Sequence, residues 1–362
     1  MHTQTKFRLL VVRLGAMGDI LHALPAVTAL RQTHPGWVID WVVEPRWRSL
    51  LATEGSAGRQ TGLNSTNPNP AQPIVDQIHM VPTRDWRKAP LSGKTIHEIK
   101  SLRQALRACD YDTVIDLQGA IRSAVVGRMA GCQRLIGEAE PRERAARWLF
   151  TEQVETHGAH VIEQDIELAS AVAGDDLKPV APWLPVDPSA EAWVDEILPR
   201  KALQPAVLIN PGAGWGAKRW PVERYAAVAQ GLIDRGFRVL VNAGPGEEPL
   251  AEAIVQTAGA ATPLDCTLEH LIALTRRVTL AIAGDTGPLH LACALGRPVV
   301  GIYGPTDPSR NGPFGTRFKV LRSPESHRDH TRHVEPEAGL LTISPDNVLA
   351  ASDELMAQEI AQ

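Results

Sequence analysis

Strand-like and helix-like segments alternate along this chain, and they do so in two separate stretches. The aliphatic and β-branched runs expected to form strands are 8–14, 38–43 and 111–117 in the first stretch, and 206–210, 237–244, 278–285 and 298–304 in the second. Segments with helical periodicity, such as 96–108, lie between them. Alternation of this kind predicts parallel sheets that are covered by helices on both faces.

A proline-rich segment, 178–188, separates the two stretches. The 362 residues suit two α/β domains of roughly 150 residues each. We therefore predict two Rossmann-like, doubly wound domains, 1–180 and 181–345, followed by a C-terminal helix, 346–362. Ligands of such sheets bind beyond the carboxyl ends of the strands, so we expect the two domains to face a central cleft that holds the active site.

Composition removes several other classes of protein. Hydrophobic residues make up 44% and charged residues 22%, which is typical of a folded globular chain. No apolar run approaches the roughly 20 residues of a membrane-spanning helix, and the N-terminus lacks the pattern of a secretion signal. We expect a cytoplasmic protein. The polar, glycine- and proline-bearing segment 53–73 is expected to be a mobile surface loop.

The charge is unevenly distributed. The net charge of −4 argues against a general nucleic-acid-binding protein. Between Arg84 and Arg147, however, thirteen Lys and Arg residues stand against eight Asp and Glu residues. This stretch either faces an anionic partner or forms solvated helix faces, and composition leaves both interpretations open.

The four cysteines, Cys109, Cys132, Cys266 and Cys293, are far apart in the sequence. No CxxC pair is present, and no histidine stands at metal-ligand spacing from any of them. We expect buried, reduced thiols and neither a zinc site nor a disulfide framework.

The first motif is the turn 15–19, GAMGD, between the first expected strand and its helix. It lacks the glycine spacing of a dinucleotide fingerprint, so a nicotinamide site is disfavoured. Asp19 has two interpretations. It caps the start of the helix, or it acts at the sheet edge as a general base toward a sugar hydroxyl.

The second motif is 284–290, GDTGPLH, at the end of a strand and the start of a helix. Free backbone amides around Gly287, the Thr286 hydroxyl and the positive helix end predict a site for a diphosphate. Asp285 suits hydrogen bonds to sugar hydroxyls or to loop amides, because a carboxylate repels phosphate. His290 either reaches a ligand or packs between elements.

The third motif is the glycine-rich segment 210–221, which is not a Walker A loop. Lys218 in this segment could stabilise the charge that builds on a departing nucleoside diphosphate. Trp215 and Trp220 either stack on a ligand or pack in the core. In the next strand-end loop, Glu247 either binds a ribose diol or is solvated.

These segments together resemble one enzyme family. RLGAMGDILHALPAV near the start, KRWPVERY in the middle and GDTGPLHLACALGRPVVGIYGPTDP near the end resemble the heptosyltransferases of lipopolysaccharide core synthesis (glycosyltransferase family 9), particularly the first of them. The resemblance covers nearly the whole chain in order. It implies a GT-B fold, an inverting transfer without a metal or other cofactor, ADP-heptose as donor and Kdo-lipid A as acceptor.

The resemblance also implies roles for individual residues. The catalytic pair would be Asp19, as base, and Lys218, which binds the diphosphate. The donor-binding residues would be Gly214, Trp215, Glu247, Asp285, Thr286, Gly287 and His290, with Glu248 as an alternative to Glu247. The acceptor-binding residues would be Gly18, Arg87, Lys88, Gln118 and Arg142. Because the acceptor is a lipid, we expect transient contact with the inner leaflet of the cytoplasmic membrane through basic residues.

Three alternatives remain. A second heptosyltransferase, or an enzyme that uses another sugar nucleotide, would share the diphosphate site. An NAD-dependent oxidoreductase would need a dinucleotide site, against which the broken glycine pattern argues. A catalytically silent nucleotide-binding module would bind ADP and transfer no sugar. The polar loop 53–73 is longer than the resemblance implies, which leaves the acceptor open.

Overall fold

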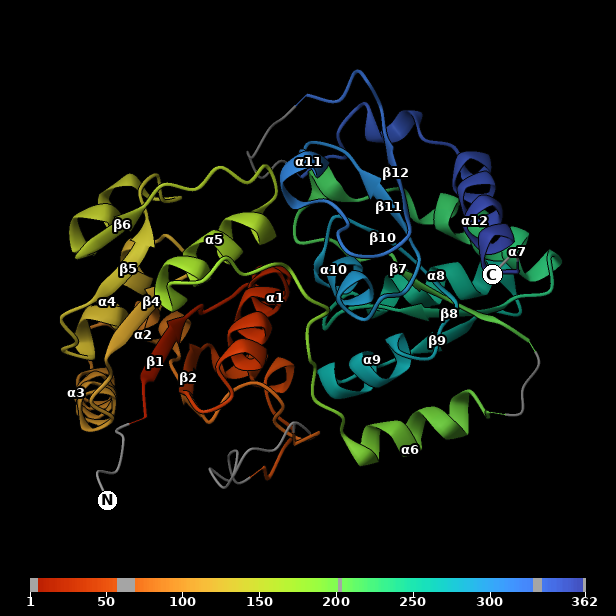
Figure 1. The fold of residues 1–362 in the computed structure, drawn as a ribbon. Helices are drawn as coiled ribbons and strands as arrows, with labels where there is room; N and C mark the ends of the chain where they lie inside the picture. Colours follow the sequence, from red (N-terminus) through yellow and green to blue (C-terminus); the bar gives the residue numbers. More distant parts are fainter. Residues whose placement is uncertain (1–5, 57–68, 201–203, 328–333, 361–362) are drawn as a thin grey trace. The chain divides into compact units, whose positions relative to one another are not determined.

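The computed structural model describes residues 6–56, 69–200, 204–327 and 334–360. The chain divides into two compact units, Met1–Val186 and Asp187–Gln362 (Figure 1). They are called the N-terminal unit and the C-terminal unit below. No helix among the described residues is both long and apolar enough to cross a membrane.

The N-terminal unit contains a six-stranded sheet in the order β3-β2-β1-β4-β5-β6, with every neighbouring pair parallel. Its strands are β1 (Arg8–Val12), β2 (Val38–Val43), β3 (Gln77–Met80), β4 (Thr113–Asp116), β5 (Leu135–Glu138) and β6 (Glu152–Val154). The central strands β1, β2 and β4 are almost entirely buried, as strands covered on both faces must be.

Helices cover both faces of this sheet (Figure 1). They are α1 (Met17–Thr33), α2 (Thr83–Lys88), α3 (Gly93–Ala108), α4 (Ile121–Met129) and α5 (Val161–Ala173), with the short 3-10 helices η1 (Pro45–Leu50) and η2 (Arg144–Leu149). Helix α1 packs against α5 and is buried along most of its length. Its buried Arg31 is satisfied by an ion pair with Asp76 and by the carbonyl oxygens of Ile74 and Trp37, both at 2.7 Å.

The C-terminal unit has a second six-stranded parallel sheet, in the order β12-β11-β10-β7-β8-β9. Its strands are β7 (Ala206–Asn210), β8 (Arg238–Asn242), β9 (Thr262–Leu264), β10 (Leu280–Gly284), β11 (Val299–Tyr303) and β12 (Phe318–Arg322). Its helices are α6 (Pro188–Ile197), α7 (Val222–Asp234), α8 (Glu248–Ala258), α9 (Leu268–Thr275), α10 (Gly287–Ala294), α11 (Pro308–Asn311) and α12 (Pro345–Ile360), with η3 (Gly216–Lys218) and η4 (Leu340–Thr342).

Numbered within its own unit, each sheet has the order 3-2-1-4-5-6 of a doubly wound nucleotide-binding fold. The predicted fold class is confirmed on this point. The predicted C-terminal helix, 346–362, corresponds to α12 (Pro345–Ile360), and the amide of Asn347 in its first turn donates to the Ser344 hydroxyl at 3.2 Å. Helix α12 contributes Val348 and Leu355 to the core of the C-terminal unit.

Some sequence expectations need correction. The strands β3, β5, β6, β9 and β12 were not predicted, since each has only three to five residues and little alternation. Residues 57–68 of the expected mobile loop lie outside the described residues. The ends of that loop are packed: Thr53 and Gln72 are buried, and the amide of Thr53 donates to the carbonyl of Ala71 at 2.8 Å.

Candidate active site

In the C-terminal unit, β7 and β10 are neighbouring parallel strands at the point where the strand order reverses. Their carboxyl ends lie at one edge, and the loops that follow them bring together residues 67 positions apart. The Lys218 ammonium forms an ion pair with the Asp285 carboxylate and donates to the Asp285 carbonyl at 3.2 Å. The Nε2 atom of His290 lies 3.2 Å from the other carboxylate oxygen of Asp285.

This ion pair is buried. The side chains of Lys218, Asp285 and His290 are 11%, 7% and 8% exposed. Burial by itself would raise the pKa of Asp285, but the hydrogen bond from His290 and the charge of Lys218 outweigh it and hold that pKa well below its ordinary value. Asp285 is therefore an anion that fixes the lysine, rather than a free acceptor for sugar hydroxyls.

Helix α10 begins next to this pair. Thr286 is its N-cap residue, and no side chain caps the helix. Instead, the Thr286 hydroxyl donates to the carbonyl of Gly284 at 3.3 Å. The positive end of α10 and the ammonium of Lys218 thus lie at the same sheet edge, where an anion such as a diphosphate is favoured.

The two tryptophans of the glycine-rich segment have different environments. The Lys218 ammonium lies 4.4 Å from the centre of the Trp215 ring, a cation–π contact that restrains the lysine. Trp220 is 3% exposed and donates from its indole nitrogen to the carbonyl of Ile343 at 3.1 Å. Trp220 is therefore a core residue, and the interpretation of this residue as a ligand-stacking group is wrong.

Glu247 lies against the same segment. Its carboxylate accepts from the amide of Ala213 at 3.2 Å and lies 3.7 Å from the Arg219 guanidinium. A Cβ added at Gly212 would overlap this carboxylate, so a larger residue there would displace the Glu247 side chain. Glu248 accepts from the amide of Gly246 at 2.8 Å. Of the two glutamates, Glu247 is the one that contacts the glycine-rich segment beside Gly214.

In the N-terminal unit, the strand order reverses between β1 and β4. Asp19 lies in the first turn of α1, directly after β1, and its side chain is 36% exposed. One carboxylate oxygen accepts from the amide of Ala16 at 2.9 Å, and the other lies 3.4 Å from the Arg13 guanidinium. Asp19 therefore caps α1 while remaining accessible to a substrate, so the two interpretations of this residue are compatible.

Two buried acids, Asp116 and Asp165, interact electrostatically with Arg13. Asp116, the last residue of β4, accepts from the amides of Gln118 and Gly119 at 2.8 and 2.9 Å, and burial raises its pKa to about 6. Asp165 of α5 is 3% exposed, and burial raises its pKa to about 7, opposed by Arg13 and reinforced by Asp19. The Oδ2 atoms of Asp116 and Asp165 have no hydrogen-bond partner among the described residues.

The residues predicted for the acceptor differ in their freedom to bind. Gln118 is buried, and its side-chain oxygen accepts from the amide of Leu14 at 2.8 Å, which joins the ends of β1 and β4. Gly18 is half-buried in the first turn of α1, and Arg142 is exposed. Arg87 and Lys88 are exposed at the end of α2, where Lys88 lies 3.5 Å from Asp85.

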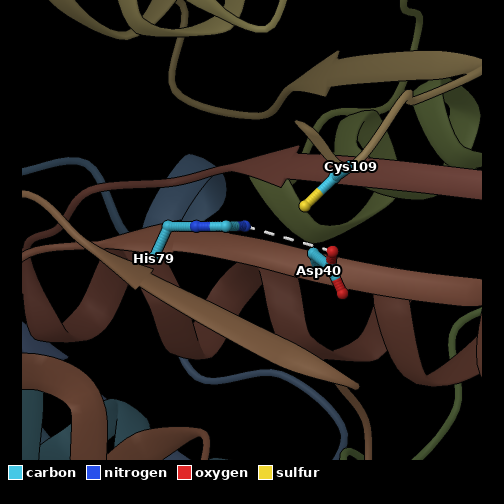
Figure 2. A group of neighbouring side chains, drawn as sticks. All are labelled: Asp40, His79 and Cys109. Carbon is cyan, nitrogen blue, oxygen red and sulfur yellow. Dashed lines mark ion pairs between the residues drawn. The ribbon is translucent and has the colours of Figure 1, made fainter. Parts of the chain in front are cut away.

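Among the described residues, one group of side chains has the composition of a metal site: Asp40, His79 and Cys109 (Figure 2). Asp40 lies within β2 and His79 within β3, while Cys109 follows α3. The Tyr111 hydroxyl donates to Asp40 at 2.7 Å and lies 2.8 Å from His79 Nε2, while Asp40 and His79 are 4.0 Å apart. An ion between them would displace Tyr111, so this group is a hydrogen-bonded core network. Burial lowers the pKa of His79 to about 4, so this histidine is neutral at pH 7.

The cysteine expectations are therefore partly wrong. All four thiols are free, but only Cys293 is buried, and the other three are half-buried. Cys109 has a histidine nearby in space that sequence spacing did not reveal.

Comparison with known proteins identifies the family. The family model for glycosyltransferase family 9 (heptosyltransferase) matches residues 99–340. Lipopolysaccharide heptosyltransferase 1 of Escherichia coli K12 is 30% identical over 88% of this chain and 95% of its own length. Lipooligosaccharide heptosyltransferase 2 of Haemophilus influenzae is 29% identical over 88% of this chain and 99% of its own.

The chain belongs to glycosyltransferase family 9.

The solved structures agree with this assignment. E. coli heptosyltransferase WaaC with ADP has a TM-score of 0.77 and 27% identity, over 96% of this chain and 100% of WaaC. The same enzyme with ADP-2-deoxy-2-fluoro heptose has a TM-score of 0.74. The protein is thus a glycosyltransferase of the heptosyltransferase family with the GT-B fold class, as the resemblance implied.

Sequence reasoning missed two charged residues near Asp19, the candidate base: Arg13 and Asp165. Arg13 follows β1 directly, and a charged residue at a strand end was an available signal. Asp165 stands on the face of α5 that carries Ile162 and Ile166, and a carboxylate within an apolar helix face was the only signal.

Proposed function

We propose that this glycosyltransferase moves a heptose from ADP-heptose to a Kdo sugar of lipid A, as a heptosyltransferase 1. The observation that carries the donor site is the buried Lys218–Asp285 pair beside the uncapped start of α10. A fixed cation and a helix N-terminus together are suited to a diphosphate. The likeness to WaaC, which was solved with ADP and with an ADP-heptose analogue, supports this choice of donor.

In the proposed reaction, Asp19 accepts the proton of the acceptor hydroxyl as that oxygen attacks the anomeric carbon of the heptose. The bond from the anomeric carbon to the diphosphate breaks, and its electron pair leaves with ADP. Lys218 and the amides at Thr286 and Gly287 stabilise the charge on the leaving group. Attack from the face opposite to ADP inverts the configuration. Protein cations supply the positive charge, so we propose that no metal ion is required.

Asp19→Asn tests the base. The variant keeps the shape of the side chain and removes the proton acceptor, so we expect at least a roughly 100-fold loss of transfer rate. The Kd for ADP should be nearly unchanged. Asp187→Asn is the matched control, because Asp187 caps α6 through the amides of Ser189 and Ala190 in the C-terminal unit. Full activity of Asp19→Asn would refute the proposed role.

The second candidate is a heptosyltransferase 2, which the 29% identity to the Haemophilus influenzae enzyme favours. The two are separated by the acceptor. Kdo-lipid A should accept heptose from ADP-heptose in the presence of chelator if the first proposal is correct. Transfer only to an acceptor that already carries a heptose would support the second. A panel of other sugar nucleotides tests the donor in the same assay.

We also propose a cytoplasmic location with transient contact at the inner leaflet, because the acceptor is a lipid and the donor a soluble nucleotide sugar. Arg87, Lys88 and Arg142 are exposed, as side chains that meet an anionic acceptor must be.

A further inference from the structure

Three large apolar side chains are exposed on one part of the N-terminal unit. Trp148 of η2 is 74% exposed, and Ile121 and Val125 of α4 are 43% and 41% exposed. Ile121 and Val125 are four residues apart and therefore share one face of α4. Large exposed apolar groups that cluster in this way mark interaction surfaces.

Helix α4 and η2 form one continuous surface. The two elements pack against each other, and the carboxylate of Glu143, the residue before η2, accepts from the amide of Ile121 at 2.9 Å. Ala146 of η2 is fully buried and anchors this short helix to the core. Trp148, two residues later, remains in solvent. We call this surface the α4–η2 face.

The α4–η2 face is strongly basic. Its exposed cations are Arg122, Arg128, Arg142, Arg144 and Arg147. The Arg147 guanidinium lies 4.9 Å from the centre of the Trp148 ring. Within 121–129 and 142–149, Glu143 is the only acid, and its carboxylate already accepts a hydrogen bond from the amide of Ile121. The excess of positive charge seen in the sequence is therefore concentrated around exposed apolar groups.

This face also adjoins the edge that carries the predicted acceptor residues. Helix α4 follows β4 by way of Gln118 and Gly119. The carbonyl of Gly119 accepts from the amide of Glu143 at 2.8 Å, and a Cβ added at Gly119 would lie 3.0 Å from the Arg142 amide nitrogen. A surface bound to the α4–η2 face would therefore lie next to the acceptor end of the sheet.

We propose that the α4–η2 face docks on an anionic lipid bilayer, with Trp148, Ile121 and Val125 in the headgroup region and the arginines against lipid phosphates. A tryptophan beside arginines matches the composition of interfacial membrane anchors. A nucleic acid or a soluble anionic saccharide would account for the arginines and not for the exposed aliphatic groups. The inference deepens the proposed function, because it identifies how the enzyme meets a lipid acceptor.

The test is co-sedimentation of the full chain with vesicles. One set contains phosphatidylcholine with about one third phosphatidylglycerol, and the other contains phosphatidylcholine alone. We expect binding to the anionic vesicles, reduced by high salt. Arg144→Glu combined with Arg147→Glu should weaken binding at least about tenfold. Trp148→Ser should weaken vesicle binding several-fold, because it removes the most exposed apolar side chain of the α4–η2 face.

Matched controls come from the C-terminal unit. Arg200 is 68% exposed and Phe318 is 46% exposed, so Arg200→Glu reproduces the reversal of a charge, and Phe318→Ser the loss of an aromatic group, elsewhere in the chain. Both controls should bind vesicles like the unmodified protein. All variants should retain the Kd for ADP, which shows that they are folded.

The outcomes separate this inference from the proposed function. Vesicle binding that depends on Trp148 and Arg147 supports the inference even if no heptose is transferred. Normal transfer to a deacylated, soluble Kdo acceptor with no vesicle binding would overturn the inference and leave the function intact. Equal vesicle binding by the unmodified protein and by the variants of the α4–η2 face would also overturn the inference. So would binding of double-stranded DNA that Trp148→Ser does not weaken, because the face would then bind nucleic acid through its arginines.

Discussion

Asp165→Asn should make this glycosyltransferase more stable at neutral pH. Asp165 is 3% exposed, its Oδ2 atom has no hydrogen-bond partner among the described residues, and burial raises its pKa to about 7. At pH 8 the folded chain therefore contains a buried carboxylate anion whose charge is opposed mainly by Arg13. Replacement with the neutral amide removes that charge at nearly constant volume.

The sign and size of the effect follow from the two pKa values of this carboxyl. Its ordinary value is 3.8, and its folded value is about 7. Between these pH values the folded state holds a proton that the unfolded state has lost, so the free energy of unfolding falls as pH rises from about 4 to about 7. Three pKa units at 1.36 kcal/mol each set an upper limit of about 4 kcal/mol.

Urea unfolding of the unmodified chain and of Asp165→Asn, at about pH 5 and about pH 8, measures this effect. The advantage of the asparagine variant should be about 3 kcal/mol larger at the higher pH. Asp176→Asn is the control. The Asp176 side chain is 81% exposed, so this substitution removes a charge from the same unit without removing a buried charge. An advantage that is equal at both pH values would refute the reasoning, since it would not come from ionisation.

Three further outcomes are expected. Lys218→Ala should raise the Kd for ADP at least about tenfold, because it removes the cation and leaves Asp285 to repel the diphosphate; an unchanged Kd in calorimetry would contradict the placement. Tyr111→Phe should lower the free energy of unfolding by about 1–3 kcal/mol, because its hydroxyl satisfies two buried partners. An unshifted urea midpoint would show that the network is not stabilising. Gly137→Ala should by itself lower the free energy of unfolding by about 1–3 kcal/mol, because the added Cβ would overlap the Phe150 ring. Thermal unfolding checks this, and an unchanged Tm would show that the ring can move aside.

Local sequence signals predicted the long elements of this fold well. The buried strands β2 and β7 coincide with their aliphatic runs, and α7 is followed by Gly236 at a positive φ of 86°, a conformation that favours glycine after a helix. These features depend on residues that are neighbours in the sequence. The short strands β5 and β6 escaped prediction because their pairing, rather than their own composition, makes them strands.

In the candidate site too, the sequence predicted the local motifs and not the contacts between distant residues. The motifs that contain Asp19, Lys218 and Asp285 were visible as glycine-bearing turns after strands. That Asp285 holds Lys218 and also contacts His290 was not visible, because Lys218 and Asp285 follow two different strands, β7 and β10. The burial of Asp165 had one local signal, its place on the apolar face of α5, but an acid in an amphipathic helix is normally solvated, so the sequence did not predict it.

The sequence by itself determined that the chain forms two doubly wound α/β units, where their main strands and helices lie, and which family it resembles. Periodicity, capping residues and glycine-bearing turns act over a few positions, so they can be read from the order of residues. Only the tertiary structure decided which charges meet and which face of α4 remains in solvent. Those outcomes depend on sheet order and burial, which set distances between residues far apart in the chain and the cost of leaving a charge unpaired.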